Sequence, residues 1–114
     1  MKILKLKKNR EFQRVYKSGV YFATKKLVIY ILRNSCDKNY FGITVGKKVG
    51  KSVVRSRVTR LIREAIRQNA QGIIPGHDIV VLARSGAGDD NFKQIEGSLA
   101  YLIKKSGLSA DGKA

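Results

Sequence analysis

The charge imbalance of this chain restricts its folding and its choice of partners more than any other feature of its sequence. Lys and Arg number 24 and Asp and Glu number 8, which leaves a formal net charge of +16 over 114 residues. Such a charge repels itself when the chain compacts, so we expect a polyanion to be bound for much of the protein's life. Nucleic acid is the leading class of partner. The hydrophobic content of 43% still suffices for one compact domain.

A membrane surface is the rival partner, because clustered basic side chains also bind anionic lipid. The sequence favours it less. No apolar run approaches the roughly 20 residues that span a bilayer, and the basic segment 1–8 is followed by polar, helix-like sequence instead of a signal peptide. We therefore expect a cytoplasmic protein without a membrane partner. Cys36 is the only cysteine, so neither an internal disulfide nor a cysteine-based metal site is expected.

The spacing of apolar residues predicts three helices and four strands. Helical periodicity starts near Asn9 and stops at Gly19, resumes from Ser52 to about Gly72, and returns in a last helix that ends before Gly107. Between these segments, short β-branched and aromatic runs predict strands at 20–23, 27–32, 40–45 and 79–83.

This order, helix-strand-strand-strand-helix-strand-helix, predicts an α+β fold. We expect a two-layer sandwich in which helices pack on a mostly antiparallel four-stranded sheet. The single domain is predicted to cover residues 1–106, and 107–114 are expected to form a flexible tail.

The second predicted helix carries a strongly basic face. Its five arginines are Arg55, Arg57, Arg60, Arg63 and Arg67. On a helical wheel, Arg60, Arg63 and Arg67 lie within about 60° of one another, and Glu64 is the only carboxylate in the helix. Each guanidinium can donate two hydrogen bonds to phosphate oxygens, so this face is a candidate RNA-binding surface. A merely solvated charged face is the alternative.

A glycine-bounded loop before this helix adds Lys47, Lys48 and Lys51 to the basic surface. Backbone N–H groups at the start of the helix are expected to add anion contacts. The loop is not a nucleotide-binding P-loop, because the sequence GKKVGKS lacks the four-residue gap that separates the first glycine from the GKS of that motif.

Aromatic side chains form a second candidate surface. Phe12 and Tyr16 share one stripe of the first predicted helix, and Tyr30 lies in the middle of a strand. Unpaired bases that stack on such rings gain roughly 1–3 kcal/mol each, with little dependence on base identity. Core packing is the alternative for all three rings. It applies least to Tyr16 and Tyr30, whose hydroxyl groups favour a polar outlet.

The acidic residues do not suggest that the chain cuts RNA by itself. A metal-dependent nuclease needs carboxylates that converge on divalent cations, and a metal-independent one needs a paired acid and base. The eight acids are scattered apart from Asp89 and Asp90, whose place before the last helix predicts a capping role. The single histidine, His77, has only Asp78 beside it, so a structural role is expected. We therefore predict no catalytic, cofactor-binding or metal-ligating residue.

Residues 46–64, GKKVGKSVVRSRVTRLIRE, resemble the signature of the bacterial ribonuclease P protein family, often called its RNR motif. Residues 12–19 resemble the first helix of that family, and residues 27–30 resemble its aromatic-bearing strand. Order and spacing agree over about residues 7–105. The resemblance implies a left-handed crossover between parallel strands around the second helix, which periodicity cannot predict.

The resemblance also implies a function. In this family, a large RNA subunit with bound Mg²⁺ removes the 5′ leader from precursor tRNA by hydrolysis, and the protein assists. It implies ribonuclease P RNA and precursor tRNA as partners, with no DNA expected. The family pattern assigns leader contacts to Phe12, Tyr16, Val28 and Tyr30. It assigns contacts with the catalytic RNA to Lys47, Lys48, Lys51, Arg55, Ser56, Arg57, Arg60, Arg63 and Arg67.

Three positions depart from the family pattern: Lys47 follows Gly46 where Ser is common, and the other two lie in the helix. Ser56 stands where Asn is usual, and Thr59 stands where a basic residue is frequent. A structural RNA-binding protein, such as a ribosomal component, is the alternative function, and it predicts binding to ribosomal RNA without an effect on leader removal. Exposed stacking rings favour the ribonuclease P subunit, because a duplex-binding protein has little use for them.

Overall fold

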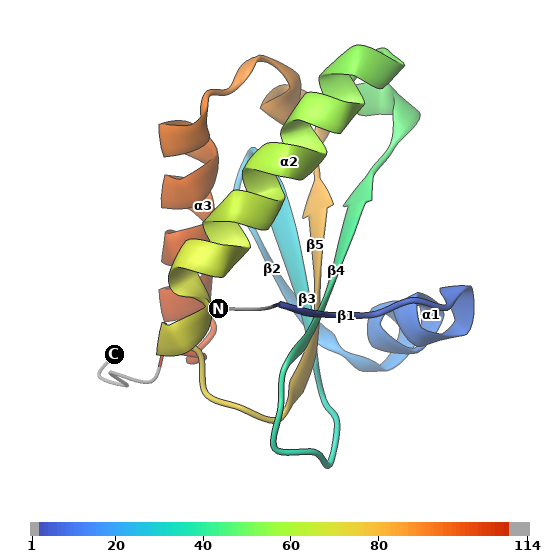
Figure 1. Cartoon of the computed structure of the whole chain (residues 1–114), viewed down its shortest axis with the longest axis vertical. Coiled ribbons are helices and arrows are strands. Elements are labelled where there is room, and N and C mark those ends of the chain that lie inside the picture. Colours follow the sequence, from blue (N-terminus) through green and yellow to red (C-terminus); the bar gives the residue numbers. More distant parts are fainter. Residues whose placement is uncertain (1–2, 110–114) are drawn as a thin grey trace.

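Within residues 3–109, five strands form one sheet, in the spatial order β1-β4-β5-β3-β2. The computed structural model describes residues 3–109 of the chain (Figure 1). In chain order, its elements are β1 (Leu4–Lys5), α1 (Asn9–Ser18), β2 (Val20–Ala23), β3 (Leu27–Arg33), β4 (Tyr40–Val45), η1 (Lys47–Val49), α2 (Ser52–Asn69), η2 (Ala70–Gly72), β5 (His77–Ala83), η3 (Ser85–Asp89) and α3 (Phe92–Lys105), where η marks a 3₁₀ helix.

The predicted α+β class and the order of the main elements are confirmed, and the sheet differs from the prediction in two details. It has a fifth strand, β1, whose two residues pair with Tyr40 and Phe41 and are too few to show an alternating pattern. It is also mixed: β1–β4 and β4–β5 are parallel pairs, whereas β3 runs antiparallel to both β5 and β2. β5 is parallel to β4 because α2 returns the chain to the end of the sheet where β4 began.

The β4–α2–β5 connection has the left-handed crossover that the family resemblance implies. In Figure 1, β4 and β5 both point upward, α2 lies in front of the sheet, and β5 stands to the left of β4. A path that rises, descends in front and rises again further to the left is left-handed. About 98% of such connections in proteins are right-handed, so this one is a distinguishing feature of the fold.

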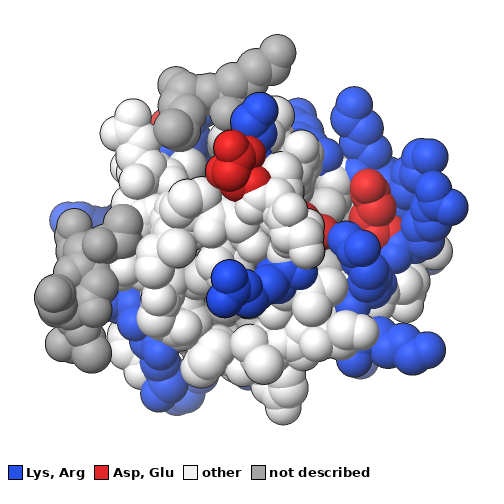
Figure 2. Space-filling model, turned by 90° about the horizontal axis from the view of Figure 1, so that it is seen from below, with Lys and Arg blue, Asp and Glu red and all other residues white. Residues whose placement is uncertain are grey.

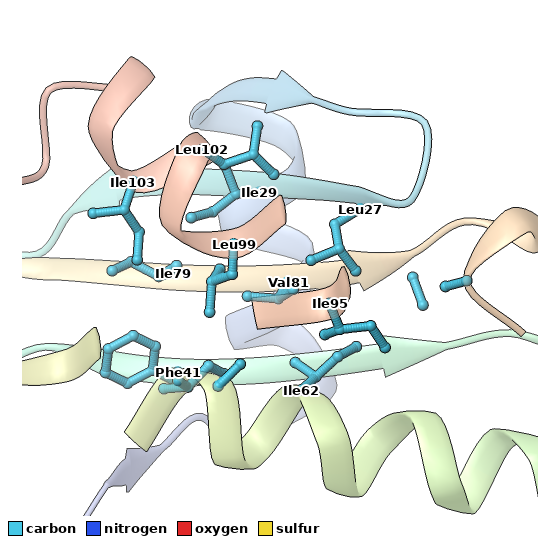
Figure 3. Close-up of a cluster of buried hydrophobic side chains, with 14 of the residues drawn as sticks. Leu27, Ile29, Phe41, Ile62, Ile79, Val81, Ile95, Leu99, Leu102 and Ile103 are labelled. Atoms are coloured by element: carbon cyan, nitrogen blue, oxygen red, sulfur yellow. The ribbon is translucent and has the colours of Figure 1, made fainter. Parts of the chain in front are cut away.

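The main core lies between the sheet and the helices α2 and α3. Figure 3 shows Ile62 of α2 and Ile95 and Leu99 of α3 directed toward Leu27 and Val81 of the strands, and these side chains are almost completely buried. The apolar side predicted for the second helix is the side that packs here. Its buried members are Val58, Ile62, Ala65 and Ile66.

A smaller cluster holds α1 on the opposite face of the sheet. Val15 of α1 contacts Val80 of β5, and both are fully buried. Val80 alternates along β5 with Ile79 and Val81, which point into the main core. Helices therefore lie on both faces of the sheet, two on one and α1 on the other, and β5 is buried from both sides.

The start of α1 is stabilised by a single carboxylate. Glu11 accepts hydrogen bonds from the backbone N–H groups of Lys7 (2.7 Å) and Lys8 (2.8 Å). These two bonds satisfy donors that a helix N-terminus leaves without partners. The bond from Lys8 and then that from Lys7 lower the pKa of Glu11 below its usual range.

Residues 107–109 belong to the packed domain, although the sequence predicts a tail from residue 107. Leu108 is buried in the main core, its carbonyl accepts a hydrogen bond from the Ile74 N–H (2.8 Å), and Ser109 forms an isolated bridge with Ile73. The reason is that the chain turns back at Gly107, whose φ of +81° favours glycine. Residues 110–114, the rest of the predicted tail, lie outside the described residues.

One glycine sets how α1 approaches the sheet. A Cβ atom on Gly42 of β4 would lie 2.5 Å from the Phe12 ring, so the ring rests on a bare stretch of strand. Phe12 is thus partly a packing residue. Because Gly42 has no side chain, the Phe12 ring can reach β4, although α1 itself packs mainly on β3 and β5.

We predict that Gly42→Ala destabilises the protein by about 1–3 kcal/mol, because the added methyl group overpacks the Phe12 ring. Gly97→Ala in α3 is the matched control. A Cβ there meets no atom within 4 Å, and alanine in a helix is favoured over glycine by roughly 0.5–1 kcal/mol. Urea unfolding of the two variants should shift the midpoint in opposite directions; equal stability of Gly42→Ala and wild type would contradict the packing role of Phe12.

Candidate nucleic-acid interface

The exposed side of α2 lines a shallow polar groove, which we call the arginine groove. The groove measures about 450 Å³, and its lining residues are Val45, Ser52, Arg55, Ser56, Thr59, Arg60 and Arg63. Arg60 and Ser56 are exposed, and Arg63 is half-buried. Neither Arg60 nor Arg63 forms an ion pair with a carboxylate of residues 3–109. Their charges therefore remain available for phosphate.

The remaining arginines of α2 have partners within the protein. Arg57 donates to the carbonyl of Asp90 (2.8 Å) and to that of Gly88, which ties α2 to η3. Arg55 donates from Nε to the Gly50 carbonyl (3.2 Å), and Arg67 pairs with Glu64 (3.0 Å). The family pattern groups all five arginines as RNA contacts. In the structure Arg57 differs from the other four, because its guanidinium donates to two backbone carbonyls at η3.

The lysine-rich loop before α2 is anchored at its centre. Val49 of η1 is buried, whereas Lys47, Lys48 and Lys51 are exposed around it. Gly50 has φ of +155°, and a Cβ there would lie 2.9 Å from Val54, so this position requires glycine. The anchor and the glycine fix the path of the loop beside the Arg55 end of the groove.

An acidic residue expected to cap α3 has a different role. Asn91 is the N-cap of α3, because its side chain accepts the Gln94 N–H (2.9 Å). Asp90 is buried, and its Oδ1 pairs with Lys26 Nζ at 3.1 Å. Lys26 Nζ also donates to the Gly86 carbonyl (3.1 Å). The predicted capping role of Asp90 is therefore wrong. A buried carboxylate is costly unless it is paired with a charged group, and Asn91 already caps α3.

The aromatic surface lies on the face of the sheet that α1 only partly covers. The Tyr16 hydroxyl is hydrogen-bonded to Thr44 Oγ1 of β4 (2.8 Å), and its ring meets Tyr30 edge to face, with centroids 4.9 Å apart. Val28 lies next but one to Tyr30 along β3 and is buried on the same face. Tyr16, Val28 and Tyr30, predicted as one group, are thus brought together, and we call them with Phe12 the aromatic groove.

The aromatic groove and the arginine groove meet at the outer edge of β4. β1 covers β4 only at Tyr40 and Phe41, which leaves the edge open from Gly42 onward. A small pocket of about 170 Å³ at this place is lined by Phe12 of α1, Gly42 of β4, and Thr59 and Arg63 of α2. Side chains from both faces of the sheet therefore border one continuous surface.

Positive charge also covers the outward side of α1, which the sequence analysis does not assign to a site. Arg10, Arg14 and Lys17 are exposed there, and Arg14 pairs with the buried Asp78 (2.9 Å). Seen from below, Figure 2 shows Lys and Arg side chains gathered on the side where α1 lies, with few acidic side chains among them. The helical wheel of α1 could have indicated this cluster.

No three His, Cys, Asp or Glu side chains within residues 3–109 lie together as a metal ion requires. His77, for example, contacts the Ile74 carbonyl through Nδ1 (3.1 Å) instead.

None of the helices in this part of the chain is long and apolar enough to cross a membrane.

Comparisons with known proteins agree over nearly the whole chain. The Ribonuclease P family model matches residues 1–107. The ribonuclease P protein component of Clostridioides difficile is 50% identical over 105 residues, covering 91% of this chain and 92% of the relative. That of Clostridium botulinum is 45% identical over 109 residues, covering 95% and 98%.

The fold agrees as well. The solved structure of the Staphylococcus aureus RNase P protein superimposes with a TM-score of 0.86 at 37% identity, covering 95% of this chain and 99% of the other. Because the sequence match and the structural match both extend over nearly all of its residues, the chain belongs to the ribonuclease P protein family.

Proposed function

We propose that this chain binds the catalytic RNA of ribonuclease P through α2 and η1, and holds the 5′ leader of precursor tRNA in the aromatic groove. The observation that carries the proposal is the pocket at the open edge of β4, where Phe12 and Arg63 border the same space. A strand of RNA whose bases stack on the rings thereby has phosphate-binding arginines within reach of its backbone. Location in the cytoplasm is part of the proposal.

The proposed division of labour leaves bond cleavage to the RNA subunit. Ribonuclease P hydrolyses a phosphodiester bond, and Mg²⁺ held mainly by the RNA would supply the charge stabilisation for that step. Three of its carboxylates have structural roles: Asp78 and Asp90 pair with Arg14 and Lys26, and Glu11 caps α1. Its contribution is to orient the substrate and to screen the charge of two RNA molecules that repel each other.

The assigned residues fall into two groups under this proposal. Lys47, Lys48, Lys51, Ser56, Arg60 and Arg63 are the exposed or half-buried groups that face the catalytic RNA. Arg55 and Arg67 reach the same side from positions where they also bond within the protein. Arg57 contributes mainly by fixing η3. Two of the departures from the family pattern, Ser56 and Thr59, line the arginine groove, and the Thr59 hydroxyl donates to the Arg55 carbonyl (2.8 Å).

The first prediction from this proposal concerns activity in the assembled enzyme. The purified protein, mixed with a bacterial ribonuclease P RNA, should raise the rate of precursor tRNA cleavage at low Mg²⁺, because its charge replaces part of the cation requirement. Protein alone should give no cleavage. A structural RNA-binding protein would bind RNA without this stimulation, so an unchanged rate would refute the proposal.

The second prediction concerns Arg60 and Arg63. Changing either residue to Ala should weaken binding of the protein to the catalytic RNA, whichever substrate is used. It should also reduce the slope of log affinity against log salt concentration by about 0.7–0.9, the value for one lost phosphate contact. Lys104→Ala removes one exposed charge from α3 and serves as the control. The same reduction in slope for Lys104→Ala would show that net charge, not the arginine groove, determines binding.

The third prediction concerns the aromatic groove. Tyr30→Ala removes a stacking surface and should weaken binding of precursor tRNA about 5-fold or more, while binding of mature tRNA changes little. Tyr16→Phe keeps the ring and deletes only the hydroxyl that bonds Thr44, so it should retain most of the preference for precursor. Equal losses for precursor and mature tRNA would contradict the assignment to the leader.

A further inference from the structure

The row of aromatic rings continues beyond the groove that the family pattern defines. Tyr21 of β2 lies directly opposite Tyr30 in the antiparallel β2–β3 pair, so the two side chains emerge on the same face of the sheet. Their ring centroids are 5.8 Å apart, with planes inclined at 42°. Tyr16, Tyr30 and Tyr21 therefore form a row that runs from α1 across β3 to β2.

Tyr21 is the open end of this row. Its side chain is 66% exposed, whereas Val28, on the same face of β3, is buried. β2 is the last strand at this side of the sheet, and no described strand pairs with its outer edge. One side of the Tyr21 ring rests against Tyr30, and much of the remainder faces solvent, which is the arrangement that an incoming flat group needs.

The electrostatic surroundings of Tyr21 suit an anionic ligand. The sequence contains no Asp or Glu between Glu11 and Asp37, a stretch that includes all of β2 and β3. Exposed Lys17 precedes β2, and exposed Lys25 follows it. An RNA strand that crosses β2 would thus have Lys17 before the strand and Lys25 after it, and β2 and β3 themselves contribute no carboxylate.

We propose that Tyr21 is an additional stacking site, which takes one more unpaired base of the leader than Tyr16 and Tyr30 alone provide. The inference rests on the proposed function and deepens it: the ligand class is single-stranded RNA, and the groove extends to the edge of the sheet at β2. A precursor whose leader is long enough to reach β2 binds more tightly than one with a shorter leader. The affinity for the shorter leader does not depend on residue 21.

The experiment measures affinity as a function of leader length. Holoenzyme is reconstituted from a ribonuclease P RNA and either wild type or Tyr21→Ala, and is titrated with precursor tRNAs whose leaders increase by one nucleotide at a time. The two enzymes should bind mature tRNA equally and diverge at a definite leader length. Beyond it, Tyr21→Ala should bind about 5-fold or more weakly, the low end of the loss expected for one stacked base.

Two further variants separate stacking from other effects. Tyr21→Phe keeps the flat ring and should retain wild-type affinity at all lengths. Tyr101→Ala removes another exposed tyrosine, 52% exposed on α3, outside the aromatic row, and should leave the length profile unchanged. Thermal unfolding of Tyr21→Ala should match wild type closely, because the side chain is mostly exposed.

The outcomes distinguish the inference from the proposed function. If wild type shows no preference for precursor over mature tRNA, the proposed function fails and the inference fails with it. If wild type shows that preference and Tyr21→Ala has the same length profile, only the inference is refuted. A loss of equal size for mature and precursor tRNA would also refute it, because residue 21 would then act on assembly or on a partner other than the leader.

Discussion

The burial of β5 on both faces is the constraint on which the rest of the structure depends. Ile79 and Val81 of this strand enter the core beneath α2 and α3, while Val80, between them, packs against Val15 of α1. Neighbours on both sides, β3 and β4, satisfy the backbone of β5. A strand that is apolar on both faces must be covered on both, so α1 and α2 are held on opposite sides of one sheet. Their functional side chains can then meet only around an open edge.

That edge is the outer side of β4. Because β1 has only two residues, it leaves β4 unpaired from Gly42 onward, and the missing side chain of Gly42 lets Phe12 approach the strand. On the other side of the sheet, α2 directs Arg63 toward the same place. A longer first strand would separate the rings from the arginines. The continuity of the proposed RNA surface therefore follows from a short strand and a glycine.

Three acids of this basic chain, Glu11, Asp78 and Asp90, are placed where they support the structure. Asp78 and Asp90 are buried and paired with Arg14 and Lys26, and Glu11 accepts the N–H groups at the start of α1. Lys26 holds the η3 segment through the Asp90 carboxylate and the Gly86 carbonyl, and Arg57 holds it through the Gly88 and Asp90 carbonyls. Gly88 of η3 in turn lies against the Val49 carbonyl, beneath the lysine loop. The Lys26–Asp90 ion pair and the Arg57 hydrogen bonds thus support the loop, whose own lysines remain exposed.

The sequence by itself determined the number of helices, the four longer strands, the apolar side of α2 and the family, because each depends on local periodicity or on a run of specific residues. It also indicated both classes of side chain that we propose to bind RNA. Only the tertiary structure decided that Arg57 holds η3, that Asp90 pairs with Lys26, and that Tyr21 extends the aromatic row. These roles depend on contacts between residues far apart in the chain, or on strand register. A local sequence pattern does not specify which distant group a side chain contacts in the folded protein.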